Sequence, residues 1–158
     1  MNFLKTPSCS VLLLILSANV LPSTSLCLFD KRYIIRSRTT NLVLDSTSQR
    51  VTLTAFTGYN PQLWCVETTA TSGISNILSF DPLDLALDAD IIGTGHSVFL
   101  NRRDHVAISE EWAVNFDGTI TNVGANLCLD GLNGDLTVGT SLQLNDCANS
   151  EKWILQEQ

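Results

Sequence analysis

A five-residue pattern occurs three times in this chain of 158 residues and constrains its fold more than any other feature. The pattern is (Asn/Asp)-Leu-x-Leu-Asp, and its copies, spaced 43 and 42 residues apart, end at Asp45, Asp88 and Asp130. An aliphatic residue stands ten residues before each aspartate, at Ile35, Leu78 and Ile120. Self-similarity at a fixed period indicates repeated copies of one structural unit. The fold must therefore divide into three similar parts.

Each repeat also holds one of the three tryptophans of the chain, two residues after a Gln or Glu. The segments are Gln62-Leu63-Trp64, Glu110-Glu111-Trp112 and Glu151-Lys152-Trp153. We expect these tryptophans to pack in the core rather than to contact a ligand, because large apolar rings are highly buried on average.

The repeats alternate apolar and polar residues between turn-forming pairs such as Asp117-Gly118 and Asn133-Gly134, which predicts short β-strands. About four strands are expected in each repeat. In the first repeat they cover residues 33–36, 42–44, 51–53 and 64–67, and in the third 119–122, 127–129, 141–144 and 153–155. A four-stranded unit of this size cannot bury its own apolar face, so three of them must close around a shared core.

The first 25 residues differ from the rest of the chain. A single charge at Lys5 is followed by an apolar run over residues 11–16 and then by small polar residues, as in a secretory signal peptide. A transmembrane anchor is the alternative, but Ser17 and Asn19 interrupt the run well short of the ~20 residues that span a bilayer. We predict a signal peptide over residues 1–25 and one extracellular domain over 26–158, with repeats at about 30–67, 68–115 and 116–158.

The charge balance argues against a nucleic-acid partner. The chain has 9 Lys and Arg against 16 Asp and Glu, which gives a formal net charge of −7. Binding to nucleic-acid phosphates or anionic lipids requires clustered positive charge. With 44% apolar and only 16% charged residues, the chain is expected to form a compact, soluble domain.

Four cysteines remain once the predicted leader is removed, and an even number in a secreted protein implies disulfide bonds. They are Cys27, Cys65, Cys128 and Cys147, which allow three pairings that the residues alone do not distinguish. The only histidines, His96 and His105, form no cluster with these cysteines, so we expect no zinc site, no other metal and no cofactor.

The phased Leu-Asp and Gln-x-Trp segments resemble those of the ricin-type β-trefoil lectins. The likeness covers the whole chain after the leader and is clearest over residues 117–130 and 141–147. It implies an all-β fold, a β-trefoil of three four-stranded repeats with pseudo-threefold symmetry, in which six strands form a barrel and six cap it. Equivalent core positions are then expected for two sets of residues: Leu44, Leu87, Leu129 and Ile35, Leu78, Ile120.

The resemblance also implies a disulfide between Cys128 and Cys147, where members of that family carry one. The pair Cys27–Cys65 then follows by exclusion. It is also consistent with the neighbouring first and fourth strands of a repeat, which it would join.

Sugar binding requires an aromatic face for the apolar side of the ring and fixed polar groups for its hydroxyls. In the resembled family these are the Asp after the second strand, an aromatic platform on the third strand, and Asn and Gln near the Trp. Here Thr54, Asn101 and Asn145 stand at the platform positions, so no repeat is complete. The candidate sugar-binding residues are Asp45, Phe56, Tyr59, Asn60 and Gln62 in the first repeat, Asp88 in the second, and Asp130, Gln143 and Asn145 in the third.

We rank the first repeat as the best site and the third as second. Asp45 is expected to matter most for binding and to lie at a surface turn. The alternative role for each of the three aspartates is that of a turn former whose carboxylate accepts local N–H groups.

Two functions follow from these observations. The first is a secreted lectin for galactose-type or related sugars, with glycans or glycoproteins as partners, which the retained aspartates favour. The second is a trefoil protein-interaction or inhibitor module with degenerate sugar sites, which the missing aromatic residues favour. An enzyme is not expected, because no nucleophile stands beside a base in a recognisable motif.

Overall fold

The computed structural model describes residues 31–81, 84–93 and 96–158. The predicted signal peptide lies outside these residues. The first repeat contains β1 (Tyr33–Ser37), β2 (Val43–Asp45), β3 (Thr52–Thr54) and β4 (Trp64–Thr68). The second contains β5 (Ser75–Ser79), β6 (Leu85–Ala89), β7 (Val98–Arg102) and β8 (Trp112–Val114). The third contains β9 (Ile120–Asn122), β10 (Leu127–Gly131), β11 (Leu142–Asn145) and β12 (Trp153–Glu157).

Short 3₁₀ helices complete the described secondary structure, and their bounds are Asn60–Gln62 (η1), Ile108–Glu110 (η2) and Leu132–Gly134 (η3). The first two stand directly before β4 and β8. In those two repeats, the Gln or Glu of the tryptophan motif is therefore the last residue of a helical turn.

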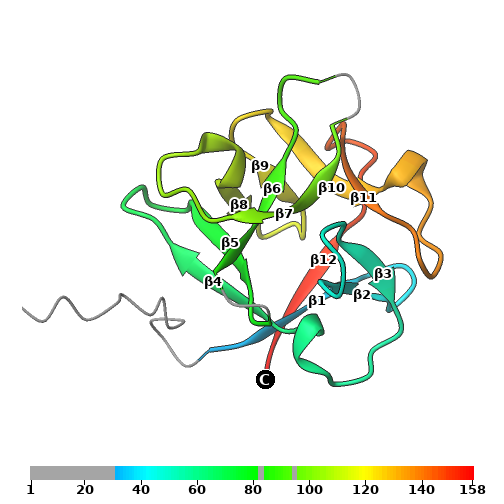
Figure 1. The fold of residues 1–158 in the computed structure, drawn as a ribbon. Helices are drawn as coiled ribbons and strands as arrows, with labels where there is room; N and C mark the ends of the chain where they lie inside the picture. The colour runs from blue at the N-terminus through cyan, green and yellow to red at the C-terminus, as the bar shows by residue number, and fades with distance from the viewer. Residues whose placement is uncertain (1–30, 82–83, 94–95) are drawn as a thin grey trace, which may run out of the picture.

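Six strands pair in the order β12-β1-β4-β5-β8-β9 and form a barrel. β1 and β12, from opposite ends of the described chain, run antiparallel along all five of their residues (Figure 1). The backbone N–H of Trp153 donates to the carbonyl of Gly118 at 2.7 Å and brings the start of β12 to the turn before β9. The barrel therefore closes between β12 and β9, the last and first strands of the third repeat.

The other six strands form three hairpins, β2–β3, β6–β7 and β10–β11, that cap the barrel. Three single β-bridges join the hairpins to one another. Arg50–Phe99 joins the first and second, Thr52–Ser141 the first and third, and Ser97–Gln143 the second and third. Three four-stranded repeats, with one barrel and one cap arranged in threefold fashion, make this an all-β, β-trefoil fold, as predicted.

The repeated leucines occupy equivalent places: Leu44, Leu87 and Leu129 are each fully buried in the main core. In the barrel, Ile35, Ile77 and Ile120 each pair with the residue two positions after a tryptophan. The prediction for Leu78 was therefore wrong by one residue. Ile77 stands 11 residues before Asp88, whereas Ile35 and Ile120 stand 10 residues before Asp45 and Asp130. A one-residue shift along a strand reverses the face of every side chain. Leu78 packs instead with Cys65 and Ala86 in a separate small cluster.

Each tryptophan links the barrel to the cap through the same hydrogen bond. The indole N–H groups of Trp64, Trp112 and Trp153 donate to the carbonyls of Leu44, Leu87 and Leu129 at 3.2, 2.9 and 3.0 Å. All three rings are buried in the central cluster. The tryptophans are therefore core residues, as expected.

The first residue of each five-residue pattern has a left-handed backbone, which explains why it is always Asn or Asp. The φ angles of Asn41, Asp84 and Asn126 are 63°, 70° and 55°. Among residues other than glycine, Asn and Asp tolerate this region best. The pattern thus encodes a turn followed at once by a buried strand.

The predicted Cys128–Cys147 disulfide is present and joins β10 to the loop between β11 and β12. Cys65 is also disulfide-bonded. Its predicted partner, Cys27, lies outside the described residues, so the second pairing stays a prediction.

Replacing a tryptophan with phenylalanine tests the link between barrel and cap. Trp112→Phe leaves the buried Leu87 carbonyl without its donor and removes part of the ring volume, so we expect it to lower the free energy of unfolding by about 2 to 4 kcal/mol. Urea denaturation followed by circular dichroism measures this. Trp64→Phe and Trp153→Phe should cost similar amounts, and losses under 0.5 kcal/mol, about the size of a surface substitution, would contradict the assignment.

Candidate functional site

The first repeat contains a surface cavity of about 430 Å³ beside the end of β2. Three of the predicted sugar-binding residues, Asp45, Tyr59 and Asn60, line it together. The other lining residues are Thr47, Thr57, Gly58, Pro61 and Asp81. Tyr59 is 73% exposed and offers an uncovered aromatic ring at this cavity.

Gln62 does not line the cavity, because its side chain is fully buried behind the loop that does. Its Oε1 accepts hydrogen bonds from the backbone N–H groups of Thr57 and Gly58 at 2.7 and 3.2 Å. Its Nε2 donates to Thr54 Oγ1 and to the Ala55 carbonyl, both at 2.9 Å. Gln62 therefore fixes the shape of the loop that carries Tyr59 and Asn60.

The Asp45 carboxylate is occupied by groups of the protein itself. Oδ1 accepts from the backbone N–H of Thr47 at 2.8 Å and from its hydroxyl, and Oδ2 accepts from Thr54 Oγ1 at 3.2 Å and Gln62 Nε2 at 3.3 Å. These partners use the roughly four lone-pair positions of a carboxylate. Asp45 is 9% exposed and is the last residue of β2, so it lies in a strand and not at a surface turn as expected.

Burial alone would raise the pKa of Asp45, but the hydrogen bonds from Thr47, Gln62 and Thr54 outweigh it and hold the pKa below its usual 3.8. The group is therefore ionised at neutral pH.

Phe56 stands outside the cavity. The Arg36 guanidinium lies 5.4 Å from the centroid of its ring, within the range of a cation–π contact. The Arg36 side chain is also bonded to the carbonyl of Asn41 at 2.9 Å. This face of Phe56 is therefore already covered.

In the second repeat, Asp88 is 5% exposed and accepts from its neighbour's backbone, Ala89 N, at 2.7 Å. Its other oxygen accepts from Asn101 Nδ2 at 3.1 Å.

The third repeat has the same arrangement: Asp130 accepts from Gly131 N at 2.8 Å, from Glu151 N at 3.3 Å and from Asn145 Nδ2 at 3.1 Å. Gln143, half-buried, pairs across the hairpin from Asp130. Asp130, Gln143 and Asn145 are therefore neighbours, but two of them are bonded to each other.

One feature is common to the three repeats and was missed by sequence reasoning. The residues at the platform positions, Thr54, Asn101 and Asn145, each donate a hydrogen bond to the aspartate of their own repeat. Each stands two residues beyond the strand partner of that aspartate. Strand pairing at a diagonal distance brings such side chains within reach. A polar residue at this register was the signal available in the sequence.

The acidic residues that replace Gln in the other tryptophan motifs also bind backbone. Both oxygens of Glu110 accept from Asp104 N, at 3.0 and 2.9 Å. Glu151 accepts from Thr39 N at 3.0 Å, from Thr39 Oγ1 at 2.8 Å and from Ser37 Oγ at 3.2 Å. Glu151 thereby ties the third repeat to the first.

Burial raises the pKa of Glu110 to about 7, with smaller contributions in the same direction from the negative charges of Asp88 and Asp104. Hydrogen bonding from Asp104 N and the positive charge of Arg103 act against the shift.

Among residues 31–81, 84–93 and 96–158, no group of His, Cys, Asp or Glu side chains is placed to hold a metal ion. The same part of the chain contains no helix long and apolar enough to cross a membrane.

No protein-family model and no curated protein matches the chain. Solved structures do resemble it in fold. The designed threefold-symmetric protein ThreeFoil superposes with a TM-score of 0.70 at 18% identity, over 78% of this chain and 96% of its own. The C-half of the earthworm R-type lectin, solved in complex with GalNAc, gives 0.64 at 21% identity, over 81% and 99%.

A third structure is much longer than this chain. The exo-β-1,3-galactanase 1,3Gal43A of Clostridium thermocellum gives a TM-score of 0.70 at 18% identity, over 80% of this chain but only 30% of its own. These likenesses show that the chain shares the β-trefoil fold.

Substituting Glu110 tests its raised pKa. Because the folded-state pKa of about 7 exceeds the usual glutamate pKa of 4.5, the folded state retains the proton to higher pH, so stability falls as pH rises from 4.5 through 7. This loss of unfolding free energy should be about 1 to 2 kcal/mol. We expect Glu110→Gln to reduce the loss and to raise the free energy of unfolding at pH 8. Urea denaturation at pH 5, 6, 7 and 8 measures it. Glu157→Gln, at an exposed position, is the control, and an unchanged pH profile in Glu110→Gln would refute the assignment.

Asp45→Ala should lower the free energy of unfolding by about 1 to 3 kcal/mol, because it removes an acceptor from several buried or half-buried donors. Thermal or urea denaturation at pH 7 measures the change. Asp135 provides a matched control, since it accepts from the backbone N–H and hydroxyl of Thr137 in the same way but on an exposed loop. Equal losses for Asp45→Ala and Asp135→Ala would show that the internal bonds of Asp45 contribute little.

Proposed function

We propose that this protein is a secreted carbohydrate-binding protein whose sugar site is the cavity of the first repeat. The observation that supports this most is the cavity itself, which brings together the exposed ring of Tyr59, the amide of Asn60 and the carboxylate of Asp81. Its volume of about 430 Å³ lies within the range of roughly 300 to 1,000 Å³ that small-molecule sites occupy.

The polar groups at this cavity are available to a ligand. Within the part of the chain that the structure describes, the side chains of Tyr59, Asn60 and Asp81 make no hydrogen bond to other protein groups. A carboxylate and an amide offer both acceptors and donors to adjacent sugar hydroxyls, and the ring offers a face to their C–H groups. Asp45 supports this site by holding Thr47 at its edge rather than by bonding the sugar itself.

The sugar is proposed to be of the galactose type. This follows from the resemblance of the repeats to ricin-type lectins, and the earthworm lectin of the same fold was solved with GalNAc. Secretion is supported by the disulfide between Cys128 and Cys147, because such bonds persist in oxidising compartments. Glycans or glycoproteins are the partners that this function requires.

A second function is favoured by a specific observation. Because Thr54, Asn101 and Asn145 take the aromatic positions and bond the aspartates, the three repeats could serve only as a scaffold for protein contacts. This interaction-module alternative predicts no sugar binding in any repeat.

Tyr59→Ala tests the sugar site. After a glycan array identifies a ligand, we expect the substitution to weaken binding by about 5- to 30-fold, which corresponds to about 1 to 2 kcal/mol for loss of the stacking face. Isothermal titration calorimetry with GalNAc or the array ligand measures this. Tyr59→Phe should bind within about threefold of the original, since a ring of similar size remains.

Phe116→Ala is the control, because Phe116 is a fully exposed aromatic residue that does not line the cavity. If the array shows no neutral glycan bound at millimolar sugar, the interaction-module alternative replaces this proposal.

A further inference from the structure

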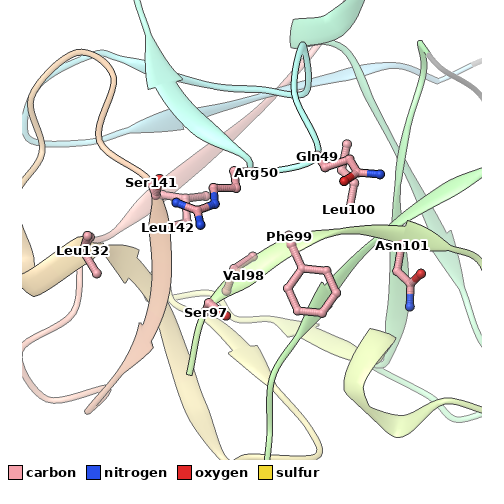
Figure 2. Close-up of a pocket in the computed structure, with 10 residues that line it drawn as sticks. All are labelled: Gln49, Arg50, Ser97, Val98, Phe99, Leu100, Asn101, Leu132, Ser141 and Leu142. Atoms are coloured by element: carbon pink, nitrogen blue, oxygen red, sulfur yellow. The ribbon is translucent and has the colours of Figure 1, made fainter. Parts of the chain in front are cut away.

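A second cavity, of about 540 Å³, lies where the three cap hairpins meet. All three repeats line it, with Gln49 and Arg50 from the first, residues 97–101 from the second, and Leu132, Ser141 and Leu142 from the third (Figure 2). The three sequence-predicted aspartates, Asp45, Asp88 and Asp130, are not among its lining residues. The cavity therefore differs from the pockets within single repeats.

The lining contains one positive charge and no carboxylate. The Arg50 side chain is exposed, and no hydrogen bond, ion pair or cation–π contact to it occurs within residues 31–81, 84–93 and 96–158. The net charge of −7 repels anions at long range, but salt at 0.1 M screens such repulsion beyond about 10 Å. The nearby guanidinium therefore favours a negatively charged ligand group in the cavity. A guanidinium can donate two parallel hydrogen bonds to the two oxygens of a carboxylate.

Phe99 supplies an aromatic face beside this charge. Its backbone forms a bridge with Arg50, which places the two side chains next to each other on one face of the sheet. In the view of Figure 2, the ring lies between Arg50 and Asn101. Val98 and Leu100 on either side are buried in the core, so the Phe99 ring lies on the opposite, outer face of the strand, where it lines the cavity.

Polar side chains complete the lining and restrict the chemistry of the rest of the ligand, apart from its carboxylate. Gln49, Ser97 and Ser141 have no hydrogen bonds from their side chains within the described part of the chain. A wholly apolar acid would cover these groups and leave them unpaired, at a cost in free energy. A ligand that carries hydroxyls as well as a carboxylate satisfies both sets of groups.

We propose that this inter-repeat cavity binds a pyranose sugar bearing a carboxylate, with Arg50 pairing the carboxylate and Phe99 stacking on the ring. Gln49, Ser97 and Ser141 bond its hydroxyls. This site is independent of the first-repeat cavity and does not rest on the function proposed above. A hexuronic acid and a sialic acid share this chemistry, and the choice between them is left to the measurement.

The test is an NMR titration of the protein with glucuronic acid, N-acetylneuraminic acid and glucose. Glucose matches glucuronic acid except for the carboxylate. We expect at least one acid to bind about 10- to 100-fold more tightly than glucose, and to shift the amide resonances of residues 49–50, 97–101 and 141–142. The acid that binds more tightly identifies the ligand class.

Variants separate the two interactions. Arg50→Gln should abolish the preference for the acid, whereas Phe99→Ala should weaken acid and glucose alike, by about 2- to 10-fold. Arg38→Gln, which removes the same charge from an exposed turn outside this cavity, should leave the titration unchanged.

Three results would overturn the proposal. The first is no binding of either acid at 50 mM, a concentration that would detect even an affinity of about that value. The others are equal binding of glucuronic acid and glucose, and a preference for the acid that persists in Arg50→Gln. Loss of acid binding in Tyr59→Ala with no loss in Arg50→Gln would also overturn it, because the acid would then occupy the first-repeat cavity. Failure of neutral sugars to bind leaves this proposal intact and counts only against the function proposed above.

Discussion

The bond between each tryptophan indole and a leucine carbonyl holds the two layers of this β-trefoil together. The tryptophan begins a barrel strand, and the leucine lies in a cap hairpin of the same repeat. A buried indole N–H requires an acceptor, and a buried strand carbonyl requires a donor. Each group therefore satisfies the other in the interior of the fold. Because the same pair recurs three times, barrel and cap keep one relative position in every repeat.

With the layers fixed, the aspartate that follows each leucine lies at the rim of the cap. Its carboxylate needs hydrogen-bond donors at that position. This chain supplies them through Thr54, Asn101 and Asn145, which bond the aspartates directly. The aspartates thus lock the ends of the hairpins. A residue that locks the fold has little remaining capacity to exchange partners with a ligand, and this is most pronounced at Asp45, whose acceptor positions are all filled.

Contacts within one repeat were predictable from the sequence, because the repeated pattern samples them three times. The tryptophans and the leucines belong to this class. The Cys128–Cys147 bond occurs in the third repeat alone among the described residues, and it was expected only from the resemblance to ricin-type lectins, because the residues themselves allowed three pairings. The position of Leu78 was not predictable, since one additional residue between Ile77 and Asp88 shifts the strand while the leucine-aspartate pattern stays intact. The inter-repeat cavity escaped prediction for a different reason. Gln49, Phe99 and Ser141 belong to different repeats, and only closure of the trefoil brings them together.

A binding site needs groups that water satisfies in the free protein and that a ligand satisfies in the complex. The protein itself already supplies partners to the aspartates of the repeats, and at Asp45 these partners fill the acceptor positions. The residues Asn60, Asp81 and Arg50 of our two proposed sites have side chains without partners in the described part of the chain, and all three stand on connections rather than on barrel strands. Connections tolerate substitution better than the elements they join. Polar residues at positions 54, 101 and 145 therefore strengthen the scaffold at the rim of each hairpin through their bonds to the aspartates, and the side chains in our two proposed sites stand on connections that can change without disturbing the layers beneath.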